Sequence, residues 1–155
     1  MATSAITPST AQSPTRLIRV VGLAVIAAGL IMLIAGAATW FMVSNQLADE
    51  KITVSADADH FAGEPIDGPL TAYAEAQVIE KHALTASGGK TYAELAKEDP
   101  KREVVMTGSF LRSSLFTSVV SFGVAVMAMG LGVLVAIIGF ALLMIGRLSP
   151  AASHA

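Results

Sequence analysis

Two long stretches of the chain carry no charged side chain, and they dominate its hydrophobic pattern. Residues 20–43 form a run of 24 such residues, and residues 113–146 form a run of 34. As a helix, the shorter run would be about 36 Å long, compared with about 30 Å for the hydrocarbon core of a bilayer. The pattern therefore predicts two transmembrane helices, one over 17–43 and one over 113–146.

The segment between these runs, residues 44–112, has a different and mostly helical pattern. A helix is predicted near 70–86, because small and apolar residues recur there at intervals of four and three. The face that they form consists of Ala72, Ala76, Ile79, Ala83 and Ala86. Gly88 and Gly89 follow, and glycine readily takes the left-handed conformation that ends a helix.

Two further signals mark helix starts in this segment. Thr91 and Glu94 have the spacing of a capping box, which predicts a short helix over 91–98. Asp99 and Pro100 combine an acidic N-cap with a proline at the first helical position. No other proline follows before Pro150. We therefore predict one helix that starts at 100 and continues through the second apolar run to 146.

Composition and charge agree with a membrane protein. The chain is 54% hydrophobic and 14% charged, whereas soluble domains average about 25% charged residues. Residues 44–112 hold all twelve acidic residues and seven of the basic ones, and only Arg16, Arg19 and Arg147 lie outside this segment. The predicted fold class is an all-α membrane protein, a two-span antiparallel transmembrane helical hairpin with an acidic, mostly helical extracytoplasmic segment.

The flanking charges predict the orientation. Arg16 and Arg19 precede the first run, whereas Asp49, Glu50 and Lys51 follow it. Because basic residues favour the cytoplasmic side, we place both termini in the cytoplasm, with residues 44–112 outside the plasma membrane. Residues 1–15, rich in Ser, Thr, Pro and Ala, are predicted to be a disordered tail, and residues 147–155 form a second short tail.

A cleavable signal peptide is the alternative for the first run. Ala35, Gly36 and Ala37 match a small-residue cleavage site, and the residues before the run are basic. The apolar stretch is longer than the usual signal-peptide core of about 7–15 residues, which favours a retained helix.

Small residues recur every seven positions on both predicted spans. They are Gly22, Gly29 and Gly36 on the first, and Ser118, Ala125, Gly132, Gly139 and Gly146 on the second. In lipid, small residues let two helices approach closely enough for extensive van der Waals contact. We expect the three glycines to face Ala125, Gly132 and Gly139 within one hairpin. Contact with a second copy or with another protein is the alternative.

One cluster in the polar segment suggests chemistry: Asp57, Asp59, His60 and Glu64. Carboxylates at alternate positions can bind Ca²⁺, and an added histidine suits Zn²⁺ or Fe²⁺. The spacing is not that of an EF-hand loop, and a solvated acidic loop explains these residues equally well. We assign no catalytic residue and no cofactor.

Several function classes are disfavoured by the same composition. Neither apolar run holds an ionisable side chain, whereas transporters and channels usually place such groups within the membrane. The acidic middle segment argues against nucleic-acid binding. The chain has no cysteine, so it has no disulfide and no thiolate nucleophile.

The phrases VSNQLADEKITVSADADHFAGEPIDGPLTAYAEAQVIEKHAL, GGKTYAELAKEDP and FLRSSLFTSVVSFGVA carry a resemblance. Over most of 17–146 the chain resembles a family of small actinobacterial two-helix membrane proteins of unknown function, whose members often bear the name "aromatic ring-opening dioxygenase". That name implies an extradiol enzyme component with Fe²⁺ held by two histidines and one carboxylate. The corresponding candidates here are His60, His82 and Glu64.

The preferred interpretation is a non-enzymatic accessory or interaction protein, surrounded by membrane lipid. Its outer segment would contact a partner protein or the cell envelope, and its small-residue faces could also form a homo-oligomer. The first alternative is an extradiol dioxygenase component, and the second is an extracytoplasmic sensor of divalent metal ions.

Overall fold

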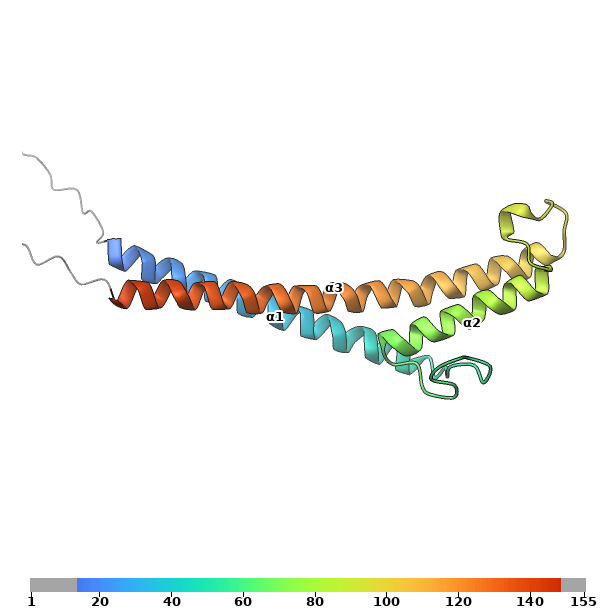
Figure 1. The fold of residues 1–155 in the computed structure, drawn as a ribbon, viewed down its shortest axis with the longest axis horizontal. Coiled ribbons are helices and arrows are strands. Elements are labelled where there is room, and N and C mark those ends of the chain that lie inside the picture. The colour runs from blue at the N-terminus through green and yellow to red at the C-terminus, as the bar shows by residue number, and fades with distance from the viewer. Residues whose placement is uncertain (1–13, 149–155) are drawn as a thin grey trace, which may run out of the picture. The chain divides into compact units, whose positions relative to one another are not determined.

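The computed structural model of the protein describes residues 14–148, and every regular element in this part of the chain is helical (Figure 1). Two long helices, α1 (Pro14–Asp49) and α3 (Lys101–Leu148), flank a segment that contains α2 (Pro69–Ser87) and one 3-10 turn, η1 (Tyr92–Glu94). The described residues form no β-strand, and a single isolated bridge joins Thr53 to Pro65. The prediction of an all-α fold is confirmed.

Helices α1 and α3 are both long and apolar enough to cross a membrane. In the most hydrophobic window of each helix, only 11% of the residues are buried within the structure. The core helix of a soluble protein would have this stretch mostly covered by other side chains. The two apolar helices predicted from the sequence are therefore present, and few residues of their most hydrophobic windows are buried.

The first long helix extends beyond its predicted limits. Pro14 and Thr15 belong to α1 and not to the tail predicted for 1–15, because a proline at the first helical position leaves no N–H unpaired. At its other end α1 continues past 43 to Asp49, and Leu47 in this extension is buried in an apolar core. The rest of the two predicted tails, residues 1–13 and 149–155, lies outside the described residues.

The second helix matches the predicted range 70–86 to within one residue at each end. It ends at Gly88, whose φ of +76° belongs to the left-handed region. The N–H of Gly89, also left-handed, donates to the carbonyl oxygen of Leu84 at 2.7 Å. The glycine pair therefore satisfies a carbonyl group at the end of the helix.

The helix predicted over 91–98 is wrong, because only η1 forms there. The capping box exists: the backbone N–H and the hydroxyl of Thr91 each donate to a carboxylate oxygen of Glu94 at 2.8 Å. The chain then becomes extended at Leu95, whose side chain is buried. The Leu95 carbonyl accepts a 2.7 Å hydrogen bond from Arg102, so burial and this bond replace a further helical turn.

Helix α3 starts at the predicted cap and runs without a break to Leu148, two residues beyond the predicted end at 146. Asp99 Oδ1 accepts a hydrogen bond from the Lys101 N–H at 2.9 Å. Gly108 does not interrupt the helix. A Cβ at Gly108 would lie 2.9 Å from the Cβ of Ala83, so this glycine allows α2 to pack closely against α3.

The chain divides into two compact units: one includes the chain up to Leu33 and from Gly130 onward, and the other spans Ile34–Met129. In the first unit, α1 and α3 pack through backbone contacts at glycine. A Cβ on Gly29 would lie 2.6 Å from the carbonyl oxygen of Gly132, and a Cβ on Gly22 would lie 3.0 Å from the carbonyl oxygen of Gly139. In addition, Arg19 Nε donates to the Gly146 oxygen at 3.0 Å.

In the second unit, the small-residue contact continues with Gly36, where a Cβ would lie 2.7 Å from the oxygen of Ala125. One turn further along α1, the rings of Trp40 and Phe122 meet edge-to-face with centroids 4.6 Å apart. The buried core of this unit draws on α1, the loop after it, α2 and α3. Its members are Leu47, Val54, Ile66, Ala72, Ala76, Leu115 and Phe122.

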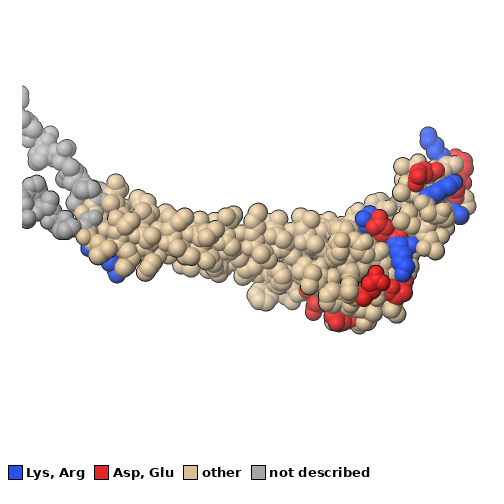
Figure 2. Space-filling view, viewed as in Figure 1, with Lys and Arg blue, Asp and Glu red and all other residues tan. Residues whose placement is uncertain are grey.

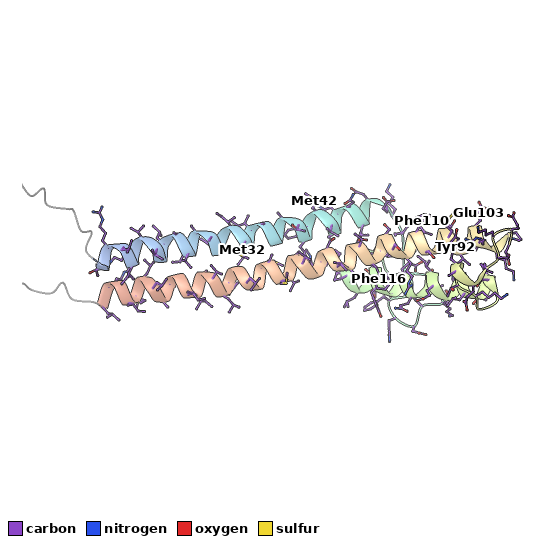
Figure 3. All side chains as sticks on the ribbon, turned by 90° about the horizontal axis from the view of Figure 1, so that it is seen from above. Met32, Met42, Tyr92, Glu103, Phe110 and Phe116 are labelled. Atoms are coloured by element: carbon purple, nitrogen blue, oxygen red, sulfur yellow. The ribbon has the colours of Figure 1, made fainter. Side chains whose placement is uncertain are left out.

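Helix α2 lies along the first half of α3 within the second unit (Figure 1). Tyr73 on α2 packs edge-to-face on Phe116, with centroids 5.7 Å apart, and Phe116 lies beside α2 in Figure 3. Arg112 forms a 2.9 Å ion pair with Glu80 across the same contact. Figure 2 shows acidic and basic side chains gathered over this unit.

Candidate functional site

The loop between α1 and α2, residues 50–68, is folded by its own backbone. The Val54 N–H donates to the oxygen of Glu64 at 2.9 Å, and the Gly63 N–H donates to the oxygen of Val54 at 2.9 Å. The Ile66 N–H donates to the oxygen of Ile52 at 3.0 Å. Because Val54 and Ile66 are also almost fully buried, the loop has a fixed shape although it contains no regular element.

Two carboxylates attach this loop to α2. Both oxygens of Glu75 are bound by Ser55: one accepts the backbone N–H at 2.7 Å, and the other accepts the hydroxyl at 2.9 Å. Asp57 Oδ2 lies 2.9 Å from His82 Nε2 and 3.3 Å from Lys81 Nζ. The hydrogen bond with His82, followed by that with Lys81, holds the pKa of Asp57 below its ordinary value of 3.8.

A cavity of about 330 Å³ lies between the tip of this loop and the first half of α2. We call it the aromatic cavity. Its lining residues are Asp57, Ala58, Asp59, His60, Phe61, Leu70, Tyr73, Ala74, Gln77, Val78 and Lys81. The volume falls at the lower end of the range for small-molecule sites, which are typically apolar with a few polar groups. This is the candidate functional site.

The backbone at the tip of the loop is strained. Phe61 has a φ of +62°, in a region that bulky side chains rarely occupy, at a cost of about 1–2 kcal/mol. The Phe61 oxygen accepts a hydrogen bond from the Glu64 N–H at 2.9 Å, which closes the turn. The Phe61 ring lies 6.4 Å from that of His60 and stays 39% exposed at the cavity. Such conformations persist where the surrounding structure imposes them.

The residues proposed as metal ligands are not assembled into a metal site. Within residues 14–148, no group of three histidine, aspartate or glutamate side chains is placed to hold a metal ion. Asp57 and His82 are paired with each other, and Asp59 and His60 line the aromatic cavity. The described residues therefore do not fit the iron site of two histidines and one carboxylate, for which the candidates were His60, His82 and Glu64.

The small residues predicted to mediate packing do lie against one another. Gly22, Gly29, Gly132 and Gly139 make their contacts in the first unit, and Gly36 and Ala125 make theirs in the second. A Cβ on any of these glycines would approach backbone atoms of the facing helix to 3.0 Å or less.

The sequence pointed to Asp57, Asp59 and His60 but not to the two aromatic residues of the lining, Phe61 and Tyr73, nor to Glu75, which holds the loop against α2. Nothing in the local sequence connects Ser55 to Glu75, which lies 20 positions further along. Gly63, two residues after Phe61, signals a turn but does not specify where the Phe61 ring points.

Comparison of the chain with protein-family models, curated proteins and solved structures finds no match.

Proposed function

We propose that the protein is an integral plasma-membrane protein with two spans, which displays an acidic helical headpiece, residues 44–112, outside the cell and acts by binding. Membership of the family of small two-helix membrane proteins is part of this proposal. The observation that carries it is the contrast between the exposed apolar residues of α1 and α3 and the polar segment, which supplies five of the seven residues of a buried core.

The uncovered surface supports lipid as the solvent of the two long helices. Ile34, Phe41 and Phe140 each expose between 59% and 67% of their surface. Contiguous apolar surface of this extent would be unfavourable in water and is favourable in hydrocarbon. Close glycine contacts are also how helices associate in lipid, where no hydrophobic force drives them together.

The residue pairing supports an antiparallel hairpin. As the glycines on α1 advance by seven, from Gly22 to Gly29, their partners on α3 fall by seven, from Gly139 to Gly132. A hairpin of this kind would return the C-terminus to the side of the membrane where the N-terminus lies.

Single cysteines test the location and the orientation, because the natural chain has none. In intact cells, a membrane-impermeant maleimide should label Ala96→Cys in the headpiece and should leave Ala152→Cys unlabelled until the cells are opened. Labelling of Ala152→Cys alone would reverse the orientation. Recovery of the protein in the supernatant after ultracentrifugation without detergent would refute the membrane assignment.

The headpiece supports a binding role because its shape is fixed while its charges face outward. Exposed carboxylates that form no ion pair in the described chain include Asp59, Glu64 and Glu98. Such groups favour contact with a basic surface. Purification in mild detergent should therefore recover a protein partner with the natural chain and lose it when these three are replaced by Asn or Gln. Identical recovery from both would contradict a headpiece-mediated contact.

A further inference from the structure

We propose that the aromatic cavity of the headpiece binds an organic cation, a ligand with an ammonium group on a small apolar body. The inference deepens the proposed binding role by naming a ligand class.

The walls of the cavity suit such a ligand. Phe61 and Tyr73, residues that are 39% and 47% exposed, contribute aromatic rings, and Leu70, Ala74 and Val78 supply an apolar surface. Ring faces carry negative charge density and attract ammonium groups, most strongly where water is partly excluded. A cavity of about 330 Å³ accommodates a trimethylammonium group together with several further carbon atoms.

The charge of the lining selects a cation over an anion or a neutral compound. Lys81 is the only lysine or arginine in the lining, and its ammonium group is already paired with Asp57. Asp59 forms no hydrogen bond or ion pair with any described residue. Its carboxylate, in the same cavity lining as the two rings, is therefore available to pair with an incoming positive charge.

The geometry of the loop gives a second and independent reason. A less strained sequence would place a glycine or asparagine at the left-handed position, yet Phe61 occupies it. The hydrogen bonds around Val54 and Glu64 hold the loop in this conformation, so the ring is presented at the cavity before any ligand arrives. Preorganised walls reduce the ordering cost of binding.

The ligand has two possible sources, a soluble ammonium compound or a lipid headgroup. Ser44 Oγ donates to the oxygen of Asp67 at 2.7 Å, which fixes the start of α2 beside the point where the apolar run of α1 ends. The exposed Leu70 side chain, one of the cavity walls, belongs to that first turn of α2. The lipid source rests on the proposed membrane location, and the soluble source does not.

The test is a titration of the full-length protein in detergent with choline and with its uncharged isostere dimethylbutanol. Nuclear magnetic resonance would follow the ring signals of Phe61 and Tyr73. Choline should change the chemical shifts of both rings until the cavity is saturated, and dimethylbutanol should leave them unchanged. Equal response to both compounds, or no saturable response to choline, would overturn the assignment. Because it is done in detergent, this result is independent of the orientation experiment.

Variants separate binding from folding. Phe61→Leu should weaken choline affinity about fivefold. Asp59→Asn, at an exposed residue with no partner to lose, should weaken it with the fold intact, and Glu98→Gln serves as its matched control away from the cavity. Loss of affinity in Glu98→Gln equal to that in Asp59→Asn would show general charge attraction and refute the site.

Nanodiscs distinguish the two sources. If a lipid headgroup occupies the cavity, choline should bind more weakly in discs of phosphatidylcholine than in discs of digalactosyldiacylglycerol, an uncharged lipid that lacks an ammonium group. Equal affinity in both would assign the site to a soluble cation. Saturable binding of a lysine-rich peptide without any binding of choline would assign the cavity to a basic protein and overturn the small-ligand proposal.

Discussion

The contact between Gly132 and α1 allows a quantitative test of the helix packing. A Cβ at position 132 would lie 2.7 Å from the oxygen of Gly29 and 2.9 Å from the nitrogen of Leu33. Ordinary contacts of a Cβ begin at 3.4 Å, so the first distance is about 0.7 Å too short. Both obstructing atoms belong to the backbone and cannot rotate away. Gly132→Ala must therefore separate α1 from α3.

Such overpacking costs about 1–3 kcal/mol. Alanine also favours a helix over glycine by about 1 kcal/mol, which would hide part of the loss. Gly130→Ala supplies the control, because it lies two residues away on the same helix and a Cβ there would meet no atom within 4 Å. The helix preference cancels between the two variants, so Gly132→Ala should be less stable than Gly130→Ala by about 1–3 kcal/mol.

Titration with a denaturing detergent would measure this difference. The chain has one tryptophan, Trp40, and its ring packs on Phe122, so its fluorescence reports the separation of α1 from α3. Helix content by circular dichroism should stay unchanged in both variants. If Gly132→Ala is as stable as Gly130→Ala, the close contact at this position does not exist and the packing argument fails.

Three further outcomes are expected in the headpiece and its core. Replacing His82 by Ala should raise the pKa of Asp57 toward 3.8 in a carbon-detected titration. Because the pKa is lowered in the folded state, ionised Asp57 stabilises the fold above pH 3.8, and this contribution is lost as the pH falls through the folded pKa. The free energy of unfolding of Asp57→Asn should therefore fall less steeply with acid than that of the natural chain. Glu75→Ala should cost about 1.5–3 kcal/mol and speed hydrogen exchange at the amide that its carboxylate binds, and unchanged exchange would contradict the attachment of the loop to α2. Phe122 is 1% exposed, so Phe122→Ala should lower the free energy of unfolding by about 3–5 kcal/mol. Phe110 is 68% exposed, so Phe110→Ala should change stability little, and equal losses of thermal stability in the two variants would refute the assigned core.

Features that depend on neighbours in the sequence could be predicted. The two apolar helices follow from runs without charge, and the limits of α2 follow from its small-residue period and the glycines after it. The start of α3 follows from Asp99, whose side chain caps the helix as expected. In each case a local rule of helix formation operates over a few residues.

Features that depend on distant contacts could not be predicted. The capping box at Thr91 suggests a helix, but burial of Leu95 and its bond to Arg102 end that helix after one turn. The end of α1 at Asp49 is set by packing around Leu47 and not by the limit of the apolar run. The aromatic cavity depends on the attachment of the loop to α2 through Ser55, which no local pattern encodes.

The seven-residue spacing of the glycines leaves the helix pair with a translational ambiguity. If α1 slid along α3 by seven residues, about 10.5 Å, Gly29 would lie opposite Gly139, and glycine would again face glycine. The ring pair of Trp40 and Phe122 has no such equivalent, because the residue seven places beyond Phe122 is methionine. The ring pair therefore favours the observed alignment within the second unit, together with the buried core that contains Leu47 and Leu115.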